Sequence, residues 1–274
     1  MSTQKTPRAL SLGVFFRALL VLLLLQASWV QAFCPVPKVD EQVQLARVVD
    51  GDTLVLTDGR KVRVLGINSP EMASGGKSAE PLAVEARRAA QKFLSKSKSL
   101  GLVFDQDPKD RYGRLLAHVY DEQGRSLAAQ LLREGLAFHI VVPPNQTQHS
   151  CLHQQEEVAR KKALGVWGHA YWQPKSASQL TSDDQGFMRI RGRVTSVSGK
   201  KEIWIELDGP LVLHVSARDK QLFGSVNWKE WKGKSIEVRG WVVNRETRET
   251  RSRGLKPLRL DLRSPYAIRL EARD

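Results

Sequence analysis

Hydrophobic and polar residues alternate along several short segments in the first half of the chain, with turn residues between the segments. A period of two predicts half-buried strands, and the Asp58-Gly59 pair between two such segments predicts a hairpin. The strands predicted in this way are residues 43–58, with a turn at Asp50-Gly51-Asp52, followed by 61–67, 101–105 and 115–120. With that turn dividing the first segment, the pattern predicts five strands.

Three other segments place apolar residues at helical spacing, with charged residues between them. They are residues 83–94, 127–136 and 149–164. Gly135 and Gly165 lie where the second and third of them end, as expected of helix C-terminal glycines. Five early strands with three interspersed helices predict an α+β fold built on a small barrel.

The composition changes after residue 172. Residues 173–185 are polar and rich in Ser, Asp and Gln, which predicts a linker. Strand-like runs follow over 190–197, 203–207, 211–215, 236–243, 258–262 and 268–271, with a short helix predicted over 219–231. We therefore expect residues 33–172 and 186–274 to form two domains, the second a small, mainly β, OB-like barrel.

The first 32 residues have the features of a secretory signal peptide. Lys5 and Arg8 precede an apolar run that is densest over 18–25, and Val30-Gln31-Ala32 resembles a cleavage site. The alternative is an uncleaved membrane anchor, but a spanning helix needs about 20 apolar residues. We expect export to a periplasm or to the medium, without stable membrane insertion after cleavage.

Charge narrows the class of partners. The formal net charge is +14, and removal of the leader with its three cations leaves +11. Such a balance favours polyanions, namely nucleic acid, anionic lipid or lipopolysaccharide, over a merely soluble basic protein. It does not predict an oligomeric state.

Cys34 and Cys151 are the two cysteines of the chain. In an oxidising compartment an isolated pair more often forms a disulfide than remains as two free buried thiols. We predict a bridge that joins the start of the mature chain to the third helix.

Charged residues gather where the first strands turn. Asp52 begins one strand, while Asn68, Ser69 and Glu71 follow another. Oxygen ligands of this kind suit a hard divalent cation such as Ca²⁺, and Arg63 between them suits a phosphate group. Phosphodiester cleavage needs a base for an attacking water and cations for the phosphoryl oxygens. The alternative is a hairpin whose charges are simply solvated.

Six segments in this order resemble the thermonuclease family of staphylococcal-nuclease-like domains. They are "VVDGDTLVL", "KVRVLGINSPE", "EARRAA", "KDRYGRLLAHVY", "LLREGLA" and "ARKKALGVWG". The resemblance covers about Gln44 to Trp167, and it is specific because the motifs are coordinated in order and spacing.

The resemblance implies a five-stranded OB-type barrel with three helices. It also implies Ca²⁺-dependent hydrolysis of single-stranded DNA, RNA and breathing duplex DNA that leaves 3′-phosphates. By position, Asp52 matches a metal ligand, Arg63 and Arg114 match phosphate-binding arginines, Glu71 matches the general base, and Tyr112 matches a tyrosine near the nucleotide phosphate.

This chain departs from the family pattern at two places. Asn68, followed by Ser69, stands where the family often has a second metal-binding aspartate. An amide oxygen still ligates a metal, but one negative charge is lost, so we expect weaker Ca²⁺ binding or use of another divalent cation. The loop that carries a base-stacking tyrosine in well-known members corresponds to residues 137–146, which contain no tyrosine.

Two readings of function follow. The joint presence of Asp52, Arg63, Glu71 and Arg114 favours a secreted or periplasmic metal-dependent nuclease. The alternative is a nucleic-acid-binding protein that has kept the fold and lost turnover, and Asn68 is its main support.

Two other features carry alternatives. His149 and His153 are four residues apart on a predicted helix, a spacing that would allow both to bind one metal ion. The simpler interpretation is that they are surface histidines beside a disulfide. The second barrel has a cationic loop over 244–256 and the tryptophans Trp204, Trp228, Trp231 and Trp241. It is interpreted as an accessory nucleic-acid or envelope-binding module, although most of these tryptophans are expected to fill its core.

Overall fold

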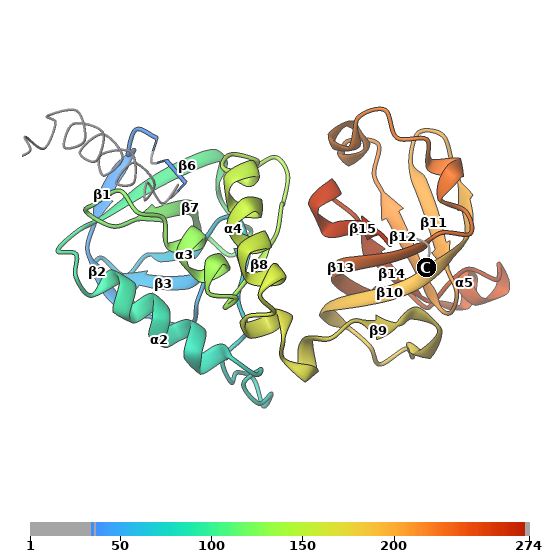
Figure 1. Cartoon of the computed structure of the whole chain (residues 1–274), viewed down its shortest axis with the longest axis horizontal. Coiled ribbons are helices and arrows are strands. Elements are labelled where there is room, and N and C mark those ends of the chain that lie inside the picture. The colour runs from blue at the N-terminus through green and yellow to red at the C-terminus, as the bar shows by residue number, and fades with distance from the viewer. Residues whose placement is uncertain (1–33, 36, 272–274) are drawn as a thin grey trace, which may run out of the picture. The chain divides into compact units, whose positions relative to one another are not determined.

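The structure is a computed structural model that describes residues 34, 35 and 37–271. Its N-terminal barrel is formed by one six-stranded sheet (Figure 1). The predicted signal peptide lies outside the described residues. The strand order is β1-β6-β7-β4-β3-β2. The strands are β1 (Glu41–Val43), β2 (Leu45–Val48), β3 (Thr53–Leu56), β4 (Lys61–Val64), β6 (Leu100–Lys109) and β7 (Leu115–Tyr120). The predicted five-stranded barrel is confirmed, and β1 is a short addition to it.

Three helices pack on this barrel: α2 (Ala83–Leu94), α3 (Leu127–Arg133) and α4 (His149–Lys161). The α2 helix buries its apolar stripe, including Ala86, Ala90 and Phe93, as its spacing predicts. Ser126 caps α3 because its hydroxyl accepts a hydrogen bond from the Ala129 amide at 3.2 Å. The two-residue strands β5 (Ile67–Asn68) and β8 (Phe138–His139) pair with each other beside the barrel.

The predicted disulfide between Cys34 and Cys151 is present. Their Cα atoms are 5.4 Å apart, and the bridge attaches the first described residue to the first turn of α4. Among the described helices, none has the length and apolar character that crossing a bilayer would require.

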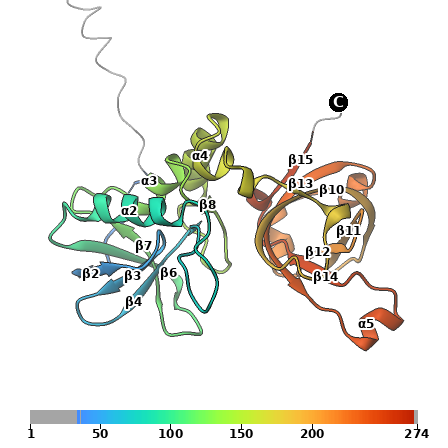
Figure 2. The same ribbon diagram turned by 90° about the horizontal axis from the view of Figure 1, so that it is seen from below.

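The second barrel is closed, and Figure 2 shows it as a ring. Its sheet has the order β15-β13-β14-β12-β11-β10-β9, and an additional β13–β10 pairing closes it. The strands are β9 (Lys175–Ser176), β10 (Gly186–Ser198), β11 (Ile203–Leu207), β12 (Leu211–Val215), β13 (Ser235–Asn244), β14 (Leu258–Asp261) and β15 (Ile268–Leu270). This confirms the predicted second β-barrel.

Three details of this half differ from the expectation. The helix predicted over 219–231 is two 3₁₀ helices, Asp219–Phe223 and Trp228–Trp231, because Gly224 between them has a φ of +60°. The segment predicted as a linker contains β9 and a 3₁₀ turn that buries Ala177. The cationic loop contains a short helix, α5 (Arg248–Ser252).

Strand β13 also faces the first barrel. Ile236, Val238 and Val242 lie in the core of the second barrel. Because side chains alternate along a strand, Glu237, Arg239 and Trp241 share its other face. Glu237 accepts a hydrogen bond from Arg160 of α4 at 3.4 Å, and Arg239 donates to Glu156 of α4 at 2.6 Å. Phe138, Trp167 and Trp172 form a separate aromatic cluster on which Phe187 of β10 packs.

Candidate active site

The turn between β2 and β3 buries a carboxylate. Asp52 is 1% exposed, and its Oδ2 accepts a hydrogen bond from the Ser69 amide at 2.7 Å. The Asp50 carboxylate accepts a hydrogen bond from the Asp52 amide at 3.0 Å, so Asp50 shapes the turn. A neighbouring carboxylate raises the pKa of a buried acid. Burial, and next the charge of Asp52, raise the pKa of Asp50 to about 7.

Gly51 allows this turn to meet the turn that follows β5. A Cβ at Gly51 would lie 2.7 Å from the Ser69 Cβ, closer than real side chains approach. The absence of a side chain at residue 51 therefore lets Ser69 donate to Asp52 across the contact.

Arg63 of β4 links the two turns. Its Nη2 lies 3.2 Å from Asp52 Oδ2 and donates to Asn68 Oδ1, also at 3.2 Å. Its Nη1 donates to the carbonyls of Val64 and Ile67 at 2.9 and 2.8 Å. Asp52 and Asn68 thus direct oxygens to one cationic group.

Asn68 and Ser69 are positioned by the β5–β8 pairing, in which Asn68 is opposite Phe138. The chain reaches β5 through Gly66, whose φ is +81° and whose Cβ would lie 2.3 Å from Leu152 of α4. Ser69 is 1% exposed, and its contact with Asp52 puts it beside the predicted metal ligands. A carboxylate, an amide oxygen and a neighbouring serine form an oxygen-only set, which fits Ca²⁺ or Mg²⁺ rather than a metal that prefers nitrogen and sulfur ligands.

Glu71 is an exposed residue just after this turn. Its amide donates to Glu80 Oε2 at 2.8 Å, which fixes the backbone. Partial burial of the carboxyl, and next the charge of Asp52, raise the pKa of Glu71, whereas Arg63 and Arg114 lower it. The carboxylate of Glu71 is thus within electrostatic reach of the other predicted catalytic residues.

Arg114 lies in the loop between β6 and β7. Its Nε donates to Asp110 Oδ2 at 2.7 Å, and its amide donates to Asp110 Oδ1 at 3.0 Å. Burial alone would raise the pKa of Asp110, but the hydrogen bonds from Arg114 hold it below its ordinary value. Asp110 therefore acts as a fixed anion that orients Arg114, a role that the sequence analysis missed.

Tyr112 is 69% exposed on the same loop. Its hydroxyl accepts a hydrogen bond from Arg111 at 2.6 Å, and the Arg114 guanidinium lies 5.8 Å from the ring centroid. The structure therefore places Tyr112 beside Arg114 but on the outer side of the loop.

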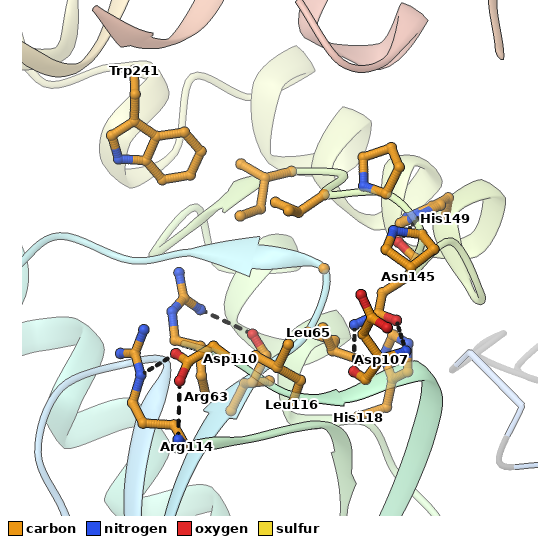
Figure 3. A pocket seen from close by; sticks show the side chains of 16 residues that line it. Arg63, Leu65, Asp107, Asp110, Arg114, Leu116, His118, Asn145, His149 and Trp241 are labelled. Carbon is orange, nitrogen blue, oxygen red and sulfur yellow. Dashed lines mark hydrogen bonds and ion pairs between the residues drawn. The ribbon is translucent and has the colours of Figure 1, made fainter. Parts of the chain in front are cut away.

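Arg63 and Arg114 open onto one cavity of about 270 Å³ (Figure 3). Its apolar lining comes from β4, β7 and the loop after β8, and Trp241 of the second barrel contributes to its wall. The apolar lining residues, Trp241 apart, are Val64, Leu65, Leu116, Ile140, Val142, Pro143 and Pro144. Asp107, His118, Asn145 and His149 add polar groups to this lining. A cavity with two arginines at one end and mostly apolar walls suits a ligand with a phosphate and a flat, weakly polar part.

His149 and His153 are half-buried rather than on the surface. The His153 ring lies 4.7 Å from that of Tyr266 in the second barrel. Nitrogen and oxygen atoms of His139, His153 and Glu156 lie within 4.8 Å of one another, the spacing of a possible metal site. The guanidinium of Arg239 donates to the same Glu156 carboxylate at 2.6 Å, so this cluster already contains a cation.

Comparison with known proteins identifies the family. Residues 61–169 match the family model described as "Staphylococcal nuclease homologue". A thermonuclease of Staphylococcus intermedius is 34% identical over 132 residues, which are 46% of this chain and 76% of that protein. The endonuclease YncB of Bacillus subtilis is 36% identical over 130 residues, 46% of this chain and 61% of that protein. A thermonuclease of Staphylococcus hyicus is 30% identical over 134 residues, 47% of this chain and 78% of that protein. The chain belongs to the staphylococcal nuclease family.

Proposed function

We propose that this protein is a metal-dependent nuclease, exported to the periplasm or the medium, that hydrolyses phosphodiester bonds of DNA and RNA. The observation that carries the proposal is the joint contact of Arg63 with Asp52 and Asn68, on a cavity that Arg114 also lines. Relatives named thermonuclease and endonuclease support the reaction class.

The two arginines supply positive charge where a phosphate would bind. Among the described residues, the one hydrogen bond from the Arg114 side chain uses Nε, so its two terminal nitrogens can bind phosphate oxygens. Fixed donors of this kind stabilise the charge that develops on the equatorial oxygens during hydrolysis.

Glu71 is suited to accept the proton of the attacking water. Its pKa is raised by partial burial and by Asp52, so the carboxylate is a better base than an ordinary glutamate. Glu71 is an exposed residue, so water can reach it. Attack on phosphorus, with the 5′-oxygen as the leaving group, would give 3′-phosphate ends.

Asp52 and Asn68 would hold the divalent cation, with Ser69 beside them. A bound cation supplies positive charge at a phosphoryl oxygen. Arg63 Nη2 contacts Asp52 Oδ2 and Asn68 Oδ1. When these two oxygens bind a metal cation instead, the Nη2 donors become available to a phosphate. We propose Ca²⁺, with Mg²⁺ or Mn²⁺ as substitutes, because Asn68 brings no negative charge.

The test is cleavage of labelled single-stranded DNA, duplex DNA and RNA by the purified protein, with Ca²⁺, Mg²⁺, Mn²⁺ or chelator. We expect cleavage only with a divalent cation, and products that a polymerase extends only after phosphatase treatment. Arg114→Ala should lower the rate about 10²- to 10³-fold, whereas the exposed neighbour Arg111→Ala should not. Glu71→Gln should lower it similarly, with the exposed Glu85→Gln as its control.

Two results would contradict the proposal. Binding without cleavage under every condition would favour the non-catalytic binding protein, whose support is the lost charge at Asn68. Wild-type rates in both Arg114→Ala and Glu71→Gln would show that the active site lies elsewhere. Export is tested separately, by locating the protein in cell fractions with and without residues 1–32.

A further inference from the structure

Trp241 is an exposed aromatic residue at the boundary between the two barrels. Of the four tryptophans that the sequence analysis singled out in the second barrel, Trp228 and Trp231 are buried in its core. Trp204 stacks on His214 with ring centroids 4.2 Å apart. Trp241 is 44% exposed and lines the cavity that also holds Arg63 and Arg114 (Figure 3).

Its position is fixed by pairing and packing. Trp241 is opposite Phe187 in the β13–β10 pair, and the two rings meet edge to face with centroids 5.0 Å apart. Phe187 packs on Phe138, 5.2 Å away, and Phe138 is paired with Asn68. Two ring contacts and one backbone pairing thus connect the indole to Asn68 of the predicted metal site.

A buried ion pair holds the interface next to Trp241. Arg239, two residues earlier on the same strand face, is bound to Glu156 of α4, and both side chains are nearly inaccessible. Buried, paired charges of this kind fix the register of two surfaces. The indole is therefore held at the cavity wall while nearly half of its surface remains accessible.

The chemistry of the cavity indicates what the indole would meet. Two arginines stand at one end, where a phosphate would bind, and the wall beyond them is mostly aliphatic and proline. Its polar members are His118, Asn145 and His149, which hydrogen-bond to protein groups, and the acid Asp107. A second phosphate would find few donors there, whereas a flat, weakly polar ring can stack on an indole. Nucleobases next to a bound phosphate have this form, and every base offers a π-face to an aromatic side chain.

We propose that Trp241 of the second barrel is the stacking platform for the nucleobase next to the scissile phosphate, so that the second barrel completes the substrate site of the first. The ligand is an unpaired nucleotide of single-stranded DNA or RNA. This inference rests on the proposed nuclease function and names the part of the substrate that the second barrel binds.

The test compares a thymidine oligonucleotide with one of equal length in which abasic residues replace the thymidines. Stacking of a base on an aromatic side chain corresponds to about a 5- to 150-fold effect. Trp241→Ala should therefore lower kcat/KM by that factor on the thymidine strand and leave the abasic strand nearly unchanged. Trp241→Phe should retain most of the activity, and Trp204→Ala, on the same barrel but away from the cavity, should behave as wild type.

A second readout does not require turnover. In chelator, Trp241→Ala should weaken binding of the thymidine strand, measured by fluorescence anisotropy, without weakening binding of the abasic strand. If the wild type binds but never cleaves, the nuclease proposal fails while this comparison still reports on Trp241. Equal losses on both strands, or no loss on the thymidine strand, would overturn the assignment. Circular dichroism of each variant shows whether it is folded.

Discussion

The ion pair between Glu156 and Arg239 predicts a pH-dependent loss of stability. Glu156 is 1% exposed, and the Arg239 guanidinium donates to its Oε2 at 2.6 Å and to the His139 carbonyl at 3.0 Å. Burial alone would raise the pKa of Glu156, but Arg239, aided by His153, lowers it to about 2. Replacement of Arg239 by Met keeps the length of the side chain but removes the guanidinium that compensates the buried carboxylate, which retains its hydrogen bond from the His139 amide.

In the Arg239→Met variant the Glu156 carboxyl can stay charged or become protonated, and the cheaper of the two sets the loss of unfolding free energy. An uncompensated buried charge costs about 3–5 kcal/mol of unfolding free energy. The alternative is protonation, which from an unfolded pKa of 4.5 costs about 5 kcal/mol at pH 8 and about 1 kcal/mol at pH 5. Arg239→Met should therefore destabilise the protein by about 4 kcal/mol at pH 8 and by much less at pH 5.

The assay is urea unfolding at both pH values, with two controls. Glu156→Gln combined with Arg239→Met should recover most of the loss at pH 8, because no charge is left buried. Arg269→Met removes a partly exposed ion pair with Glu157 between the same two barrels and should cost at most about 1 kcal/mol. A loss that is under about 1 kcal/mol at pH 8, or equally large at pH 5, would refute the reasoning.

Three further predictions concern single features of the first barrel. Burial lowers the pKa of His118 to about 4, so the unfolded state binds a proton at higher pH than the folded state does. Stability should therefore fall by up to about 3 kcal/mol on this account as the pH drops from 6.5 to 4. His118→Gln should remove this contribution in urea titrations at several pH values, while the part due to buried His139 stays. Asn68→Asp should tighten Ca²⁺ binding about tenfold or more in calorimetry, because a second carboxylate joins Asp52; unchanged affinity would place the metal elsewhere. Replacement of Cys34 and Cys151 by Ala should lower the unfolding free energy by roughly 4–5 kcal/mol, since the bridge closes a loop with a sequence separation of 117; a loss below about 1 kcal/mol would show that the reduced chain has other constraints.

Local pattern predicted much of the fold. Both ends of α2 agree with the apolar spacing of residues 83–94, and α4 begins at His149, as its pattern indicates. The helix expected over 219–231 was wrong because helical spacing continues through Gly224, whose backbone conformation interrupts the helix. Short strands such as β5 and β8 have too few residues to show a period of two, so their pairing could not be seen in the sequence.

The candidate site also has a part that the sequence predicts and a part that it does not. Asp52, Arg63 and Asn68 lie within a short stretch of chain, so a hairpin and the turn after it were enough to predict that they meet. The contribution of Trp241 depends on the packing of two barrels, which no local pattern encodes. One signal was available in the sequence: Glu237, Arg239 and Trp241 alternate with the apolar residues of β13, and a polar strand face that carries a tryptophan indicates a covered surface or a ligand.

The place of Trp241 in the chain determines when the cavity is completed during synthesis. Domains of a growing chain generally fold from the N-terminus onward. Arg63, Glu71 and Arg114 belong to the first barrel, whereas Trp241 reaches the cavity only after β13 has paired with β10. A nascent chain that ends before β13 therefore has every predicted catalytic residue but an unfinished cavity, and the cavity is complete only once β13 has been made and has paired with β10.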